Sequence, residues 1–315
     1  MSEVKKIATR EAYGKALAEL AATNPNVVVL DADLAKSTKT ADFAKVAPDR
    51  FFDCGIAEQN MTGVAAGLAA AGKIPFASSF AVFSTGRAFE QIRNSVAYPK
   101  LNVKIAATHA GISVGEDGGS HQSIEDIALM RALPNMTVIV PADAEEARQA
   151  VLAAAEYNGP VYLRLGRLAT DAVFGADYKF ELGKGVLVRP GSDIVLFACG
   201  MMVGEAMKAA DLLAEEGISA AVANIATIKP LDTAFIAAQA AACGAALTVE
   251  EHSIIGGLGS AVAETLAETT PVPFGRVGVE DQFGQSGSPA VLLRAYGLTA
   301  ENIASRAKGV IAKKK

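Results

Sequence analysis

The stretch "NVKIAATHAGISVGEDGGSHQSIEDIALMRALPNMTVIVPAD", residues 102–143, decides the fold class of this chain. It opens with an apolar run at 102–109 and passes through a polar, glycine-rich segment at 109–122. An amphipathic run follows at 123–133, and a second apolar run closes the stretch at 136–143. Short apolar runs indicate buried strands, and a helical pattern between two of them indicates parallel strands joined by a helix.

The same alternation continues on both sides of this stretch. Further buried strands are predicted at 26–33, 74–79, 159–166, 193–200, 219–230, 245–253 and 273–281. Amphipathic or alanine-rich helices are predicted at 8–24, 143–157, 200–217 and 258–268. Strands that alternate with helices predict an α/β fold in which helices cover both faces of each parallel sheet.

The length of the chain, 315 residues, is more than one ordinary hydrophobic core holds, so two domains are expected. Polar and glycine-rich residues interrupt the alternation at 180–190. We therefore predict two α/β domains, each a mainly parallel sheet flanked by helices, at residues 1–183 and 184–315.

The composition narrows the classes of partner. The chain is 51% hydrophobic and 20% charged, with a net charge of −5, so nothing favours binding to nucleic acid or to a membrane surface. The sequence contains neither a signal-peptide pattern nor an uncharged apolar run long enough to span a bilayer. Its three cysteines are scattered and form neither a disulfide framework nor metal-ligand spacing. These features predict a cytoplasmic protein.

Polar segments follow three of the predicted strands, at 31–38, 109–122 and 163–167. Ligands of parallel α/β sheets bind beyond the carboxyl ends of the strands, so these segments are expected to carry the chemistry. Segment 109–122 contains four glycines, two acids and both histidines of the predicted first domain. It contains no nucleotide-binding fingerprint, and the spacing of His109 and His121, without a third soft ligand, matches no metal site. We interpret it as a functional loop rather than a flexible surface loop.

Two further features have an ordinary structural interpretation when the residues are considered alone. Glu58, in "CGIAEQNMTG" at 54–63, stands where a helix begins, a position that the helix dipole favours for an acid. A carboxylate that enters the core at that point is costly unless a partner or a proton compensates it. Phe80 and Phe83 lie at helical spacing and by themselves favour a core position.

Taken together, these segments resemble a known family. "FFDCGIAEQNM", "PFASSFAVF", "THAGISVGEDGGSHQSIEDIALMRALPNMTVIVPAD" and "GPVYLRLGR" have the order and spacing of the pyrimidine-binding domain of transketolases. "VEEHSIIGGLGSAVAE" resembles the C-terminal domain that follows it in that family. Full-length transketolases bind the cofactor diphosphate and a metal through a preceding domain with a GDG motif, and no such element is present in this sequence. The chain therefore resembles the C-terminal subunit of a split transketolase.

The resemblance implies an enzyme that transfers a two-carbon ketol unit from a ketose phosphate to an aldose or aldose phosphate through thiamine diphosphate. An N-terminal transketolase subunit would hold the diphosphate and Mg²⁺ or Ca²⁺, so this chain is expected to contribute no metal ligand. Self-association through both domains would complete an α2β2 assembly.

The resemblance also implies roles for individual residues. Glu58 corresponds to the acid that hydrogen-bonds to the cofactor's aminopyrimidine ring and shares a proton with it, which burial in an apolar wall favours. Phe80 and Phe83 would form the aromatic pocket around that ring, and Asp33 would lie at the edge of the cofactor. His121 is the second candidate for catalysis.

The substrate residues come from four separate segments. Asp117 and His121 correspond to residues that contact the hydroxyl groups of the sugar. The phosphate of the substrate would be held by Arg10, Ser37, His109 and Arg167. One departure from the family is Gly86, where many transketolases have an aromatic residue, so the rim of the pocket is expected to be smaller or filled by the partner.

Three alternatives remain open at this point. Deoxyxylulose-phosphate synthase shares the architecture, but it is normally one long chain and does not match the Arg10 and Ser37 pattern. The β-subunit of a 2-oxo acid dehydrogenase has this size, although "GEDGGSHQSIED" is more similar to transketolase. The third alternative is a non-catalytic binding protein that retains this half of the fold. The presence of Glu58, His109 and His121 argues against it.

Overall fold

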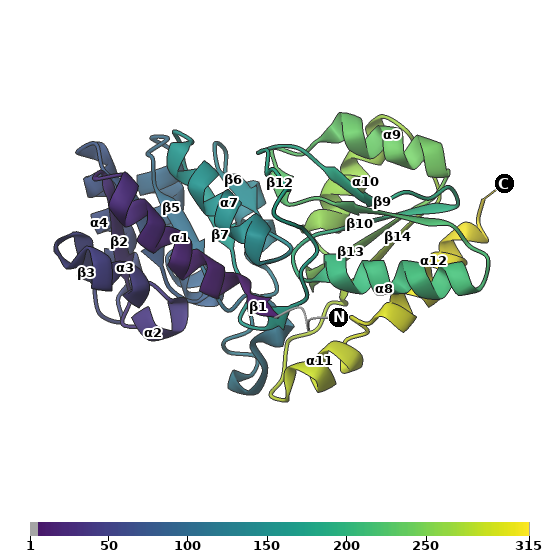
Figure 1. Ribbon diagram of the computed structural model, residues 1–315, viewed down its shortest axis with the longest axis horizontal. Helices are drawn as coiled ribbons and strands as arrows, with labels where there is room; N and C mark the ends of the chain where they lie inside the picture. Colours follow the sequence, from purple (N-terminus) through teal and green to yellow (C-terminus); the bar gives the residue numbers. More distant parts are fainter. Residues whose placement is uncertain (1–5, 315) are drawn as a thin grey trace.

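The computed structural model describes residues 6–314, which form two α/β lobes that lie side by side (Figure 1). The sheet of the first lobe contains β2 (Val27–Asp31), β3 (Phe51–Asp53), β4 (Ile74–Ser78), β5 (Lys104–Ala107), β6 (Thr137–Ile139), β7 (Val161–Arg164) and β12 (Thr227–Lys229). Their order in space is β12-β6-β7-β5-β4-β2-β3. All neighbours are parallel except β12, which runs antiparallel to β6.

Helices cover both faces of this sheet. They are α1 (Thr9–Thr23), α2 (Ala35–Thr38), α3 (Ala41–Val46), α4 (Glu58–Ala70), α5 (Phe89–Gln91), α6 (Asp126–Ala132) and α7 (Ala144–Glu156), with short 3₁₀ segments at Pro48–Arg50 and Ile112–Asp117 and π-helical turns at Phe83–Arg87 and Ile92–Ala97. Val27 and Val29 of β2 pack in the core with α1 and α7, whereas Val28 and Leu30 pack on the opposite face, with α4. Alternate residues of the strand are therefore buried on both sides, as a covered parallel sheet requires.

The second lobe has a five-stranded sheet of its own. Its strands are β9 (Val186–Arg189), β10 (Ile194–Ala198), β11 (Ala220–Asn224), β13 (Ala246–Ser253) and β14 (Phe274–Val279), in the order β14-β13-β10-β11-β9, and only β9 is antiparallel. Its helices are α8 (Met202–Glu215), α9 (Thr233–Cys243), α10 (Leu258–Glu268), α11 (Pro289–Ala295) and α12 (Ala300–Ile311), with α9 and α10 on one side of the sheet and α8 and α12 on the other (Figure 1). A two-stranded ribbon joins β1 (Ile7–Ala8) to β8 (Ala169–Thr170). The predicted pair of mainly parallel α/β folds is confirmed.

One predicted strand is wrong in its extent. The run 219–230 forms two strands: β11 belongs to the second sheet, and β12 crosses to the edge of the first. The crossing is held by the amide of Val140, which donates to the carbonyl of Ala226 at 2.7 Å, and by pairing of Thr227 with Ile139. The apolar core continues from one lobe to the other at this point, since Val138 and Phe197 belong to one cluster of buried side chains. The division between residues 183 and 184 stays a prediction.

The carboxyl ends of β2, β4, β5 and β7 meet at one edge of the first sheet, which brings the polar segments that follow them together. Two non-glycine residues at this edge, Asp33 and His109, have positive φ angles of 61° and 58°. Such strained conformations are concentrated at functional sites. Within residues 6–314, no helix combines the length and the apolar character needed to cross a lipid bilayer.

Candidate functional site

Glu58 begins α4 and is 1% exposed, at the edge of the sheet where β4 ends. Its Oε1 accepts a hydrogen bond from Ser79 Oγ at 3.2 Å, and its Oε2 lies 2.7 Å from Nη1 of Arg87. The buried carboxylate thus has an ion-pair partner and a hydrogen-bond donor. These two partners offset the free-energy cost of burying an acid at the start of an alanine-rich helix.

Arg87 is a site residue that the sequence analysis missed. Its guanidinium lies 4.5 Å from the centroid of the Phe83 ring, so it covers that ring while it holds Glu58. At Gly86, where an aromatic residue was expected from the family, an added Cβ would meet nothing within 4 Å. Arg87 therefore covers Phe83 on a rim that Gly86 leaves open. No local signal predicts this contact, because Glu58 and Arg87 are far apart in the sequence.

Two phenylalanines form an aromatic wall beside Glu58. The rings of Phe80 and Phe83 are nearly parallel, with an interplanar angle of 12° and 6.0 Å between centroids. Phe80 stacks on His109 at 3.7 Å, and Phe83 meets His121 edge-on at 5.2 Å. The wall therefore links Glu58 on one side to both histidines of the glycine-rich loop on the other.

Beyond the wall lies a cluster of cationic and polar groups. Nη1 of Arg10 donates to the carbonyl of Ser37 at 2.9 Å and lies 3.0 Å from Nε2 of His109. Burial, followed by the nearby charge of Arg167, lowers the pKa of Arg10. Its Nε is buried and has no hydrogen-bond partner among the described residues. An unpaired buried donor among convergent positive charges is the feature expected of an anion-binding site.

His109 is held in its neutral form. Burial first, then the charges of Arg10 and Arg167, lower the pKa of this imidazole to about 3. Because Arg10 donates to Nε2, we assign the ring proton to Nδ1, which then donates to Thr108 Oγ1 at 2.8 Å. A neutral imidazole of this kind can form hydrogen bonds without adding charge.

We expect the His109 imidazole to show no titration between pH 5 and pH 8. A folded-state pKa well below the ordinary value means that the ring accepts a proton only in strong acid. The measurement is the pH dependence of the imidazole Cε1–H chemical shifts, which is simple to assign because the chain contains three histidines. A His109→Gln variant identifies the resonance. A midpoint between pH 6 and 7 would show that Arg10 and burial do not control this ring.

The remaining predicted residues lie on the glycine-rich loop and next to it. Nη1 of Arg167 donates to the carbonyl of Val114 at 2.6 Å and lies 3.3 Å from Oδ2 of Asp117. Nδ1 of His121 lies 2.9 Å from Ser120 Oγ. A sugar phosphate would therefore have to compete with Asp117 for Arg167.

The structure brings nine of the predicted site residues into one region. Arg167 belongs to this region because its charge lowers the pKa of both Arg10 and His109. The other eight residues are Glu58, Phe80, Phe83, Arg10, Ser37, His109, Asp117 and His121. Asp33 is exposed at the turn after β2, and within residues 6–314 its side chain makes no hydrogen bond or ion pair to the others. Its proposed place at the cofactor edge stays a prediction.

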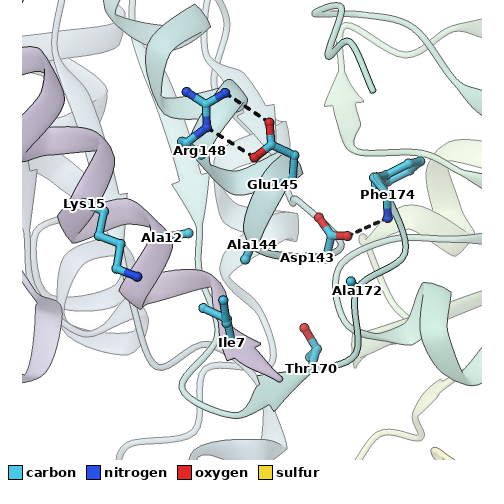
Figure 2. Close-up of a pocket in the computed structure, with 10 residues that line it drawn as sticks. All are labelled: Ile7, Ala12, Lys15, Asp143, Ala144, Glu145, Arg148, Thr170, Ala172 and Phe174. Carbon is cyan, nitrogen blue, oxygen red and sulfur yellow. Dashed lines mark hydrogen bonds and ion pairs between the residues drawn. The ribbon is translucent and has the colours of Figure 1, made fainter. Parts of the chain in front are cut away.

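A separate pocket of about 270 Å³ lies between α1, α7 and the segment at 170–174 (Figure 2). Figure 2 shows partners for three of its charged groups: Arg148 pairs with Glu145, and Asp143 accepts from the amide of Phe174. None of the predicted site residues lines this pocket. We therefore place the functional site at the strand ends.

The sequence matches two family models in tandem. The model of the transketolase pyrimidine-binding domain matches residues 5–171, and that of the transketolase C-terminal domain matches residues 183–303. Together these matches span most of the chain. The resemblance seen in the motifs is thus confirmed over both halves.

Similar proteins include other chains of this length. A protein from Methanocaldococcus jannaschii named as a transketolase C-terminal section is 53% identical over 300 residues, covering 94% of each chain. A 6-deoxy-6-sulfo-D-fructose transketolase subunit from Clostridium sp. is 44% identical over 305 residues, covering 97% of this chain and 95% of that subunit. A solved structure described as a split-gene transketolase in an inactive β4 tetramer has a TM-score of 0.91 at 56% identity, covering 99% of this chain and all of its own.

The transketolase family depends on thiamine diphosphate and consists of transferases. The buried Glu58 and the parallel rings of Phe80 and Phe83 lie in the half of this chain that matches the pyrimidine-binding domain. Together with the relatives of the same length, these matches show that the chain belongs to the transketolase family and corresponds to its C-terminal section.

Proposed function

We propose that this chain is the catalytic C-terminal subunit of a split transketolase, which transfers a two-carbon ketol unit from a ketose phosphate to an aldose or aldose phosphate. The observation that supports this proposal most strongly is an unbroken line of contacts from an acid to an anion-binding cluster. The line runs through Glu58, Arg87, Phe83, Phe80, His109 and Arg10. An acid–base group at one end, a flat apolar wall beside it and a phosphate site at the other end would suit ketol transfer.

The residues present are suitable for the pyrimidine end of thiamine diphosphate. Glu58 offers a buried carboxylate to a ring nitrogen, and Phe80 and Phe83 offer flat apolar surfaces to an aromatic ring. When bound, the cofactor supplies the electron sink for cleavage of the carbon–carbon bond of the ketose. Glu58 would hold and return a proton at the ring nitrogen. Asp33 would lie at the edge of the cofactor.

The substrate phosphate would bind to the cationic cluster. Arg10 and Arg167 can each give forked, charge-assisted hydrogen bonds to a phosphate, and the neutral His109 and the Ser37 segment would fix its orientation. Asp117 and His121 would face the hydroxyl groups of the sugar. His121, which meets Phe83 edge-on, is also placed to exchange a proton with the substrate.

The diphosphate and Mg²⁺ or Ca²⁺ would be held by an N-terminal transketolase subunit, and two copies of each chain would form an α2β2 enzyme in the cytoplasm. The support is the relationship to proteins named as a C-terminal section and as a split-gene transketolase. Self-association through both lobes would place each site where subunits meet.

Reconstitution with the N-terminal subunit tests the proposal. We expect the isolated chain to bind thiamine diphosphate weakly and to show no ketol transfer, because the diphosphate contributes much of the binding energy. The assembled enzyme, checked for an α2β2 mass by light scattering, should transfer glycolaldehyde units when ketose phosphates are screened as donors. Micromolar cofactor binding by the isolated chain would contradict the split-subunit assignment. Condensation of pyruvate with an aldose phosphate would instead indicate the synthase-type reaction.

A further inference from the structure

The glycine-rich loop at 109–122, which carries Asp117 and His121, contacts the second lobe. Strand β13 reaches its base, and the segment 281–289 that follows β14 reaches its tip. The loop therefore lies between the proposed substrate site and the C-terminal half of the chain. No residue of that half was assigned a role in the site by the sequence.

Glu251 of β13 makes the contact at the base of the loop. Its side chain is 5% exposed, and its Oε1 accepts a hydrogen bond from the backbone amide of Ser113 at 2.5 Å. Gly111 packs directly on the same carboxylate with a φ of +82°, and a Cβ at that position would overlap the carboxylate atoms. The loop thus has a backbone shape that fits around this one acid.

The position of Glu251 is itself fixed. Nη2 of Arg164 donates to the carbonyl of Glu251 at 2.9 Å and to that of Ser123 at 3.3 Å, while the amide of Gly111 donates to the same Ser123 carbonyl at 2.8 Å. Arg164 also pairs with the buried Asp126 at 2.6 Å. One guanidinium therefore links β13 to the point where the loop closes.

Burying Glu251 is costly for the fold. Burial raises the pKa of its carboxyl group, and the charge of Arg164 opposes the shift only in part. In the described part of the chain, its side-chain hydrogen bond goes to the loop. An apolar side chain of the same size would fill the space at less cost, so stability of the second lobe does not explain an acid at this position.

The tip of the loop has matching contacts with the segment after β14. Ser286 Oγ donates to the carbonyl of Glu116 at 2.7 Å, and Nε2 of the buried Gln122 donates to the carbonyl of Gln285 at 3.0 Å. A Cβ on Gly119 would lie 2.6 Å from the Gly284 carbonyl oxygen, so the two backbones touch. Asp117 lies between Glu116 and Gly119, both of which contact this segment.

We propose that Glu251 is a positioning residue for the sugar-binding loop, through which the C-terminal lobe sets the geometry of Asp117 and His121. The inference rests on the proposed function for its kinetic consequence, whereas the anchoring of the loop is independent of it. Small displacements of substrate-contacting groups cost large factors in rate, so a loosened loop lowers kcat/KM for the sugar phosphate.

Paired substitutions at one position separate anchoring from packing. Glu251→Met keeps the approximate volume and removes the acceptor, whereas Glu251→Gln keeps an acceptor for the Ser113 amide. In the isolated chain, hydrogen exchange of the 110–122 peptide should be about tenfold or more faster in Glu251→Met and nearly normal in Glu251→Gln. In the assembled enzyme, kcat/KM should fall by about tenfold or more in Glu251→Met and by less than about threefold in Glu251→Gln.

Glu250, the preceding residue, provides a matched control. It is also buried, but its carboxylate accepts from the amides of Leu258 and Gly259 at 2.7 Å, within the second lobe. Glu250→Met should increase exchange around the start of α10 and leave the 110–122 peptide unchanged. Equal loosening of this peptide in both Met variants would overturn the proposal, because it would reflect general destabilisation.

A variant on the loop side keeps the proposal testable if Glu251→Met does not fold. Gly111→Ala places a Cβ against the Glu251 carboxylate and should speed exchange of the same peptide and lower kcat/KM. Normal exchange and normal kinetics in Gly111→Ala would overturn the anchoring role. An assembled wild-type enzyme without ketol transfer would contradict the proposed function instead, while the exchange contrast between the Met and Gln variants would still decide the anchoring.

Discussion

Glu58→Gln is expected to lower the turnover of the assembled transketolase by about two to four orders of magnitude, the scale of an essential acid–base group. Glutamine keeps the size of the side chain and can still accept from Ser79, but it cannot hold or return a proton. Binding of thiamine diphosphate should weaken less than turnover, because the aromatic wall of Phe80 and Phe83 is unchanged. Steady-state kinetics and a cofactor titration separate the two effects.

Glu90→Gln is the matched control for this substitution. Glu90 is exposed on helix α5, and its carboxylate accepts hydrogen bonds from Gln91 and Asn94. Its variant should retain full turnover. Near-normal turnover in Glu58→Gln would show that Glu58 has no acid–base role and is only a buried acid at a helix start, paired with Arg87.

Arg10→Ala and Arg167→Ala should each raise KM for a phosphorylated acceptor by about 10- to 150-fold. A hydrogen bond to a charged group contributes about 1.5–3 kcal/mol, and every 1.36 kcal/mol is a factor of ten. Turnover at saturation should change less, since the phosphate is remote from the bond that forms. The assay compares acceptors with and without phosphate, with an unphosphorylated ketol donor held at saturation.

Glycolaldehyde, which carries no phosphate, is the internal control, and KM for it should be nearly unchanged in both variants. Arg148→Ala adds a control for the loss of an arginine, because Arg148 pairs with Glu19 and Glu145 on the outer surface. If KM rises equally for the phosphorylated acceptor and for glycolaldehyde, the two arginines stabilise a subunit interface rather than bind a phosphate.

The elements with a clear apolar pattern could be predicted from the sequence, and those without one could not. Helix α7 has the regular apolar stripe of an amphipathic helix and was predicted nearly to its ends. Helix α9, "TAFIAAQAAAC", has no charged residue and no stripe, so nothing distinguished it from other apolar segments. The strand β12 was predicted as an extended segment, but its place in the first sheet depends on pairing with β6 across the molecule.

The sequence by itself determined the alternation of strands and helices, and it singled out the residues that we propose as reacting groups. Glu58, the phenylalanine pair and the polar loop stand at positions that their local spacing and family resemblance indicate. Each of these features is a short stretch of chain, within which propensity, periodicity and turn chemistry act.

Only the tertiary structure decided which of these groups touch. The partnership of Glu58 with Arg87, the convergence of Arg10 with His109, and the contact of Glu251 with the loop all join segments that are distant in sequence. The order of strands in a sheet is not their order along the chain, so the loops at its carboxyl edge acquire neighbours that no local pattern specifies. Burial then makes each of these contacts strong, because a buried charge or polar group is costly until a partner compensates it.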